Sequence, residues 1–111
     1  MVIREKEMKV KEQTIVNQII AYLKLNGYFV WRQNTGAMKL DNRFIQFGFK
    51  GISDVIGMTP SGRFIAIECK VKGNKPTQFQ TDFLGDVVRH GGIAILAYSL
   101  DDVISELDTN V

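Results

Sequence analysis

Asp54 and the triplet Glu68-Cys69-Lys70 are the residues of this chain whose types and spacing best suit chemistry on phosphate. Both lie in apolar stretches that are typical of largely buried strands, where charged groups are costly unless they bind something. The turn signal Pro60-Ser61-Gly62 lies midway between them. We therefore predict a hairpin that places Asp54 opposite Glu68 or one of its two neighbours.

Side-chain alternation brings the three charges onto one patch. Glu68 and Lys70 are expected to share one face of their strand, whereas Cys69 points to the other face. Cys69 is therefore predicted to be a small core residue rather than a nucleophile. Asp54, Glu68 and Lys70 then present two carboxylates and one ammonium group to the same ligand.

Two adjacent carboxylates favour a hard divalent cation, Mg²⁺ or Mn²⁺, which usually keeps positions for water and substrate phosphate. A cation held by Asp54 and Glu68 would activate water and neutralise charge on a phosphodiester. Lys70 would orient the water or stabilise the phosphorus centre. The alternative is a structural salt bridge between Glu68 and Lys70 on an exposed sheet face, because Glu-x-Lys is a common triplet.

Glu12 is a further candidate for this site. Residues 9–26 are predicted to form an amphipathic helix that stops at Gly27, since apolar side chains recur at helical spacing from Ile15 to Leu23. Glu12 falls on the apolar side of this helix. The pattern leaves two roles open: a third ligand or supporting group of the metal site, or an acid favoured by the helix dipole.

Composition indicates an ordinary globular protein. The chain has 111 residues, 45% hydrophobic and 23% charged, as expected for one domain over residues 1–111 with a flexible or frayed N-terminus at residues 1–8. The single cysteine excludes an internal disulfide. Neither a signal peptide nor an apolar run long enough to cross a bilayer is recognisable, so a cytoplasmic protein is expected, in the host cytoplasm if viral.

The net charge of +2 is too small to identify nucleic acid as a partner by itself. Basic residues nonetheless bracket the predicted site. The candidates for phosphate contacts are Arg32, Lys39, Arg43 and Lys50 before Asp54, and Lys72 and Lys75 after Glu68. Alternatively they are solvated loop charges. A further basic stretch, residues 4–11, is expected to be a solvated helix start or tail.

Residues 28–33 are predicted to form a strand. Its Tyr28 and Trp31 either stack on bases or, as is favoured, pack in the core or in an interface. Residues 37–49 are ambiguous, because the turn signal Asp41-Asn42 suits both a small hairpin and a loop over the site.

Residues 77–90 are predicted to form a helix that Thr77 caps and Gly91-Gly92 ends. Gln80 shares the apolar face of this helix, whereas Gln78 lies on the solvent face. Gln80 is therefore the better candidate for a functional glutamine.

The remaining elements complete a fold class. Residues 93–98 are expected to form an interior strand parallel to a neighbour, because a helix precedes them. Ser99 and Asp102 resemble the capping box of a last helix. Helices and strands in this order indicate an α/β or α+β domain with a mixed β-sheet flanked by helices.

Together these residues resemble the restriction-endonuclease-like nucleases with the PD-(D/E)XK motif, and most closely the VRR-NUC group, the virus-type replication-repair nucleases, over roughly residues 11–107. The matching residues are Glu12, Lys50-Gly51-Ile52-Ser53-Asp54, Glu68-Cys69-Lys70, Pro76-Thr77, Gln80, Gly91-Gly92 and Ser99-Leu100-Asp101-Asp102. Ser53 stands where the wider superfamily often has proline, a change of backbone stiffness rather than of chemistry.

The resemblance implies an αβββαβ order with a C-terminal helix, and an endonuclease dependent on Mg²⁺ or Mn²⁺. It implies Asp54 and Glu68 as ligands, with Glu12 completing the site. Lys70 would position the nucleophile, and Gln80 would support the site. Small stand-alone members of this group are similar to Holliday junction resolvases. The resemblance therefore also implies a homodimer that cuts four-way junctions or other branched DNA in DNA repair, and a phage as a plausible source.

Three alternatives remain open at this level. The same constellation would serve a nuclease for flaps, nicked duplex or a specific sequence. A non-catalytic nucleic-acid-binding module would keep the fold without the reaction. The charged residues would otherwise form a buried ion network in a protein-binding domain.

Overall fold

The computed structural model describes residues 5–33, 37–40, 43–46 and 50–109, and for the segments 37–40 and 43–46 it describes the backbone alone. The helices among these residues are α1 (Glu5–Leu25), α2 (Gln78–Arg89) and α3 (Leu100–Thr109). The strands are β1 (Phe29–Arg32), β2 (Ala37–Leu40), β3 (Arg43–Gln46), β4 (Val55–Met58), β5 (Phe64–Cys69) and β6 (Ile93–Ala97).

The main sheet is mixed and has the order β1-β4-β5-β6. β4 pairs antiparallel with β1 and with β5, whereas β6 lies parallel to β5. The connection from β5 to β6 runs through α2, which is the crossover that parallel neighbours require. The predicted parallel strand and the predicted hairpin of β4 and β5 are both confirmed.

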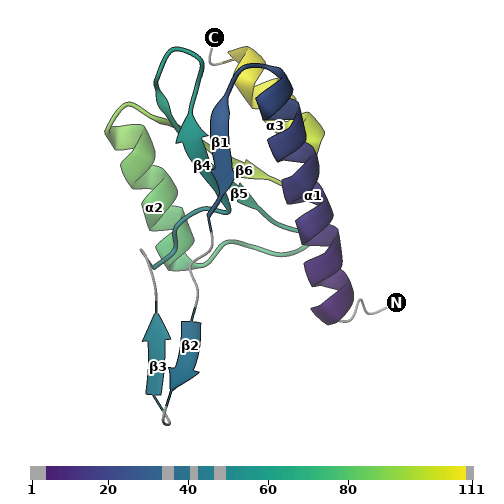
Figure 1. Ribbon diagram of the computed structural model, residues 1–111, viewed down its shortest axis with the longest axis vertical. Helices are drawn as coiled ribbons and strands as arrows, with labels where there is room; N and C mark the ends of the chain where they lie inside the picture. Colours follow the sequence, from purple (N-terminus) through teal and green to yellow (C-terminus); the bar gives the residue numbers. More distant parts are fainter. Residues whose placement is uncertain (1–4, 34–36, 41–42, 47–49, 110–111) are drawn as a thin grey trace.

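Helices cover both faces of this sheet (Figure 1). α1 and α3 pack on one face, where the larger hydrophobic cluster joins Ile19 and Leu23 to Ile65, Ile67 and other strand residues. α2 packs on the other face through Val87, which contacts a smaller cluster around Ile56 and Ala66. The alternation of β5 accounts for this division, because successive side chains enter opposite clusters. The predicted α/β class with a flanked mixed sheet is confirmed, and it is compatible with a restriction-endonuclease-like core.

The hairpin of β2 and β3 forms a separate two-stranded sheet. Its register pairs Leu40 with Arg43, and Figure 1 shows it below the main sheet. Of the two alternatives for residues 37–49, the small hairpin is confirmed for the segments that the structure describes. Apart from this hairpin, the elements follow the predicted order αβββαβ with α3 at the end.

Element ends agree with the sequence signals in most places. α1 begins at Glu5, before the predicted start at residue 9, and ends ahead of Gly27, whose φ of 83° is accessible to glycine. Thr77 caps α2 in a complete capping box. At α3, Ser99 Oγ accepts the Asp102 backbone N–H, but the Asp102 carboxylate accepts from Tyr98 rather than from Ser99, so the predicted box is only half formed.

The two aromatic residues of the first predicted strand differ in environment. Tyr28 is partly buried and packs against the larger cluster. Trp31 is 39% exposed, and its ring lies 5.3 Å from that of Phe29. Core packing is therefore confirmed for Tyr28, whereas Trp31 lies at the surface and its packing in an interface stays a prediction. The reason is that β1 is an edge strand, whose side chains on the α2 side are not covered by that helix.

Candidate active site

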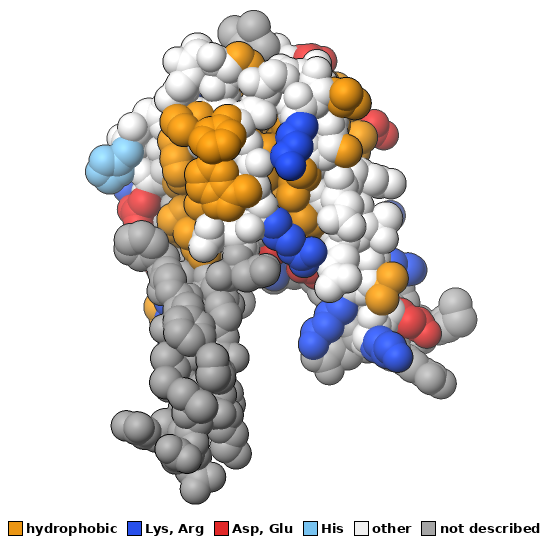
Figure 2. Space-filling view, in the orientation of Figure 1, with side chains coloured by type: hydrophobic (Ala, Val, Ile, Leu, Met, Phe, Trp, Pro, Cys, Tyr) orange, Lys and Arg blue, Asp and Glu red, His pale blue; other side chains and the backbone are white. Residues whose placement is uncertain are grey.

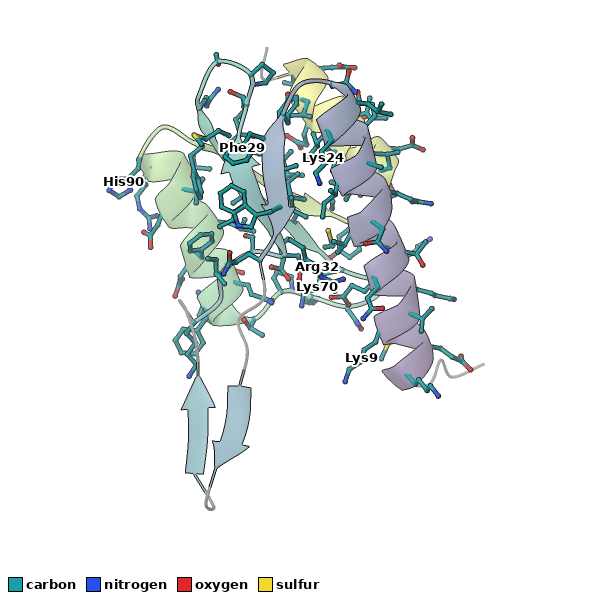
Figure 3. All side chains as sticks on the ribbon, in the orientation of Figure 1. Lys9, Lys24, Phe29, Arg32, Lys70 and His90 are labelled. Atoms are coloured by element: carbon teal, nitrogen blue, oxygen red, sulfur yellow. The ribbon has the colours of Figure 1, made fainter. Side chains whose placement is uncertain are left out.

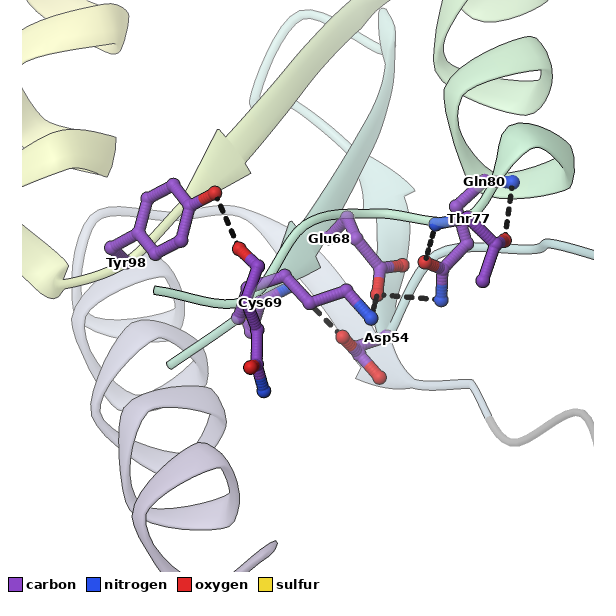
Figure 4. Close-up of polar contacts among 8 residues, drawn as sticks. Asp54, Glu68, Cys69, Thr77, Gln80 and Tyr98 are labelled. Atoms are coloured by element: carbon purple, nitrogen blue, oxygen red, sulfur yellow. Dashed lines mark hydrogen bonds and ion pairs between the residues drawn. The ribbon is translucent and has the colours of Figure 1, made fainter. Parts of the chain in front are cut away.

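The predicted charges meet at one end of the main sheet, where β4 begins and β5 ends (Figure 4). The register of the hairpin pairs Val55 with Ile67. The preceding residue, Asp54, therefore lies opposite Glu68, as predicted. α2 begins beside this end of the sheet, so its first turn is also available to the site.

Asp54 is held by backbone contacts on both sides. Its Oδ2 accepts a hydrogen bond from the Cys69 backbone N–H at 2.8 Å. Its own carbonyl accepts from the Gln33 N–H at 2.7 Å. These contacts fix Asp54 between two neighbouring strands, with Oδ2 directed at the backbone of β5.

Glu68 is the buried centre of the site, with an exposed fraction of 1%. One oxygen, Oε2, accepts from Gln80 Nε2 at 3.0 Å and lies 3.7 Å from Lys70 Nζ. The other oxygen, Oε1, is buried and has no hydrogen-bond partner among the described residues. The salt bridge with Lys70 exists, but the alternative that placed it on an exposed sheet face is wrong, because α2 covers this part of the sheet.

The electrostatics of Glu68 follow from this burial. Burial raises the pKa of Glu68 from 4.5 to about 8, and the neighbouring charge of Asp54 adds to the increase. The charge of Lys70 opposes this increase, whereas the charge of Glu12 adds to it. When both carboxylates are ionised they repel each other, and a proton or a cation bound between them would remove this repulsion.

Gln80 connects the site to the start of α2. While its Nε2 donates to Glu68, its Oε1 accepts from the Thr77 backbone N–H at 2.8 Å. The capping box thus sets the direction of the amide group. Gln78 instead donates to Asp82 along the exposed side of the helix. The prediction that distinguished the two glutamines by helix face is confirmed in their placement.

Gly51 allows the chain before β4 to approach α2 closely. Its φ is +83°, and a Cβ atom there would lie 2.4 Å from the backbone carbonyl atoms of Phe79. No other residue type fits this contact without displacing backbone. The close approach helps to keep Asp54 next to the helix turn that carries Gln80.

Glu12 lies on the other side of Asp54. Both residues line a pocket of about 220 Å³ together with Lys9, Gln13, Val16 and Arg32. Burial and the charge of Asp54 raise the pKa of Glu12, whereas Lys70 and Arg32 oppose the increase. The prediction that Glu12 faces inward toward the site is confirmed.

The set of three carboxylate ligands predicted for a metal is not assembled. Among the residues that the structure describes, no group of three His, Cys, Asp or Glu side chains is arranged to hold a metal ion. The sheet register joins Asp54 and Glu68, whereas Glu12 comes from a separate helix and lines the pocket on the other side of Asp54. The pair itself suits Mg²⁺ or Mn²⁺: these ions accept one or two protein carboxylates, and Glu68 Oε1 is a buried oxygen without a partner.

Cys69 points away from the charges into the larger hydrophobic cluster. Burial raises the pKa of its thiol, and the charges of Asp54 and Glu68 add to this effect. A thiol in such surroundings is a poor nucleophile. The prediction of a core residue is confirmed.

The predicted phosphate contacts fall in different places. Arg32 lines the Glu12 pocket, and Lys50 lies with its Nζ 4.2 Å from the centre of the Phe79 ring. Lys72 and Lys75 are exposed in the loop after β5. Lys39 and Arg43 belong to β2 and β3, and their side chains lie outside the described residues. The site prediction missed Lys9 and Gln13, although helical spacing places both beside Glu12 and Val16.

No model of a known protein family matches this chain. Over 38 residues the chain is 40% identical to a protein named "Putative nuclease p44" from Acyrthosiphon pisum secondary endosymbiont phage 1. The matched segment is 34% of this chain and 41% of the length of the phage protein. The likeness is therefore partial, and membership of the VRR-NUC group stays a prediction.

No helix among the described residues combines the length and the apolar character needed to cross a membrane.

Proposed function

We propose that this protein is a metal-dependent nuclease that hydrolyses phosphodiester bonds of DNA. The observation that carries the proposal is the pairing of Asp54 with the buried Glu68. Lys70 and Gln80 contact one oxygen of Glu68, and the other has no hydrogen-bond partner among the described residues. A purely structural carboxylate rarely remains buried with an unsatisfied oxygen. The partial similarity to a phage protein named as a nuclease supports the same class.

The carboxylates of Asp54 and Glu68 would hold Mg²⁺ or Mn²⁺, and Glu68 Oε1 has no hydrogen-bond partner among the described residues. When bound, such a cation supplies charge neutralisation to the phosphate and a lowered pKa to water. Holding it also keeps Glu68 ionised, because a cation offsets the burial that otherwise raises its pKa.

Lys70 would act on the reacting groups directly. Its Nζ lies 3.7 Å from Glu68 Oε2, and its side chain is 15% exposed, so the ammonium group reaches the surface beside the carboxylate pair. At that position it would orient the attacking water and stabilise charge that develops on the phosphate oxygens. Gln80 and Glu12 would be positioning residues: Gln80 holds the Glu68 carboxylate, and Glu12 sets the charge around Asp54.

We further propose branched DNA as the substrate, four-way junctions above all, and a homodimer as the active form. A four-way junction is resolved by two symmetric cuts, and one chain carries a single carboxylate pair. This part of the proposal rests on the resemblance to the VRR-NUC group. A flap or nicking nuclease with the same site is the alternative enzyme.

The proposal is tested with labelled four-way junction, flap and linear duplex DNA, with and without Mg²⁺ or Mn²⁺. Glu68→Ala and Asp54→Ala serve as site variants, and Glu7→Ala on the exposed side of α1 is the matched control. Paired metal-dependent cuts in the junction that both site variants lose would support the full proposal. Cleavage of the flap or of the duplex alone would keep the proposed active site and change the proposed substrate.

Two outcomes would overturn the nuclease assignment itself. Metal-independent binding without cleavage of any substrate would favour the non-catalytic module. Full cleavage by both site variants, with the fold confirmed by circular dichroism, would remove Asp54 and Glu68 from the reaction.

A further inference from the structure

The pocket on the α1 side of Asp54 combines donors from two elements. Lys9 and Gln13 come from α1, and Arg32 comes from the end of β1. Figure 3 shows Lys9 near the same end of the molecule as Arg32 and Lys70, whereas Lys24 lies toward the opposite end of α1. The pocket, about 220 Å³ in volume, is large enough for a phosphate group with part of its sugar.

The charges of this pocket are balanced in the protein alone. The two positive charges of Lys9 and Arg32 offset the two carboxylates of Glu12 and Asp54, which line the same pocket. A divalent cation held at Asp54 would leave the pocket net positive. An anion would therefore bind here together with the cation rather than before it.

We propose that this pocket binds the DNA phosphate next to the one that is cut, with Lys9 and Arg32 as its charged donors. The inference rests on the proposed function and adds a subsite to it. Asp54 lines the pocket and also belongs to the carboxylate pair, so a phosphate in the pocket lies beside a phosphate at the pair. Successive phosphates of one strand have such a neighbouring arrangement.

The two donors would differ in their contributions. The Arg32 guanidinium suits two parallel hydrogen bonds to phosphate oxygens, whereas the Lys9 ammonium acts as a compact charge. Gln13 offers an amide N–H from the next turn of α1. The phosphate would be either an internal phosphodiester or a terminal monophosphate, since both present the same oxygens.

Binding in Ca²⁺ tests the subsite without requiring cleavage. The probe is a four-way junction, whose branch point fixes the register, with single phosphates replaced in turn by uncharged methylphosphonates. Lys9→Ala and Arg32→Lys are the pocket variants, and Lys24→Ala, an exposed lysine of the same helix, is the control. We expect each pocket variant to raise the Kd about tenfold and Lys24→Ala to leave it unchanged.

At one position, the methylphosphonate should raise the Kd of the original protein about tenfold. The same replacement should not raise the Kd of Lys9→Ala further, because that variant has already lost the contact between Lys9 and this phosphate. Ends that carry hydroxyl instead of phosphate distinguish a terminal from an internal phosphate. The subsite would be overturned if Lys9→Ala and Lys24→Ala changed the Kd equally. It would also be overturned if the effects of Lys9→Ala and of the methylphosphonate were additive at every position. Cleavage is measured separately in Mg²⁺. Failure of the proposed nuclease activity is therefore distinguished from failure of the proposed phosphate subsite.

Discussion

Glu68 illustrates how one residue links burial, charge and metal binding. Its folded-state pKa of about 8 lies above its ordinary value of 4.5, so folding favours the protonated form. The stability gained from this carboxyl group is complete below about pH 4.5 and is lost as the pH rises through about 8. A bound divalent cation would remove this dependence by stabilising the ionised form.

The first prediction uses Glu68→Gln in a chelating buffer. The free energy of unfolding of the original protein should fall between about pH 5 and pH 8, and that of the variant should fall much less, because the amide does not ionise. Urea denaturation across this pH range measures both. Glu7→Gln, at an exposed position of α1, should keep the original profile. An unchanged profile in Glu68→Gln would contradict the assigned cause.

Lys70 provides a second residue-scale prediction. Lys70→Ala should lower the cleavage rate at least about a hundredfold, because charge stabilisation at the phosphate is lost. The affinity for Mn²⁺, measured by calorimetry, should change far less. Lys24→Ala is the control, since Lys24 is exposed on α1 and lies away from Lys70 (Figure 3). A large loss of metal affinity with an unchanged rate would assign Lys70 a structural role.

At the scale of elements, α2 contributes to the site through its first turn. Gln80→Ala should impair cleavage strongly and Gln78→Ala should not, because only Gln80 donates to Glu68. Gln80→Glu separates the two functions of this side chain. It retains an acceptor for the capping box but loses the donor to Glu68, so stability of the helix start should persist while the cleavage rate falls. Equal rates for the alanine variants would exclude Gln80 from the site.

The contact between Gly51 and α2 leads to a prediction with a close control. Gly51→Ala combines an unfavourable φ with a collision against the Phe79 backbone. Gly62→Ala has a similar φ of +89° but meets nothing within 4 Å. Gly62→Ala should lower the free energy of unfolding by about 1–2 kcal/mol. Gly51→Ala should lower it more and should also slow cleavage. Thermal denaturation and cleavage rates measure both effects.

The whole molecule leaves one sheet face partly uncovered. Phe29 pairs with Met58 and Met58 with Phe64 across three strands, and these side chains are exposed beside Trp31. Figure 2 shows apolar side chains gathered in this region of the surface. A twofold interface brings one patch against its own copy, so an apolar patch is self-complementary without matching charges. It is the surface on which the proposed homodimer would form.

Phe29→Ser should therefore shift the protein from dimer to monomer in analytical ultracentrifugation, since Phe29 is 64% exposed at the edge of this patch. Leu25→Ser is the control, because Leu25 is 87% exposed at the end of α1, away from the patch. Paired cutting of a junction should be lost along with the dimer. An original protein that sediments as a monomer in the presence of junction DNA would contradict the homodimer.

Local sequence patterns were sufficient to predict most of the helices and strands and the pairing of Asp54 with Glu68. Period-2 alternation placed Glu68 and Lys70 on one face, the turn at residues 60–62 brought Asp54 opposite Glu68, and helical spacing distinguished Gln80 from Gln78. These are local patterns, set by a few residues along the chain. These patterns depend on residues close together in the sequence rather than on the packing of the whole protein.

The approach of α1 to Asp54 and Glu68 could not be predicted from local patterns and follows from how the helix packs on the sheet. The tertiary structure placed Glu12 in a pocket with Asp54, Lys9 and Arg32, and the described residues contain no group of three side chains arranged to hold a metal. It also left Trp31 exposed at an edge strand and Glu68 Oε1 buried without a partner. The physical reason is that helix packing joins residues far apart in sequence, and its distances depend on the side chains of the whole core rather than on local spacing.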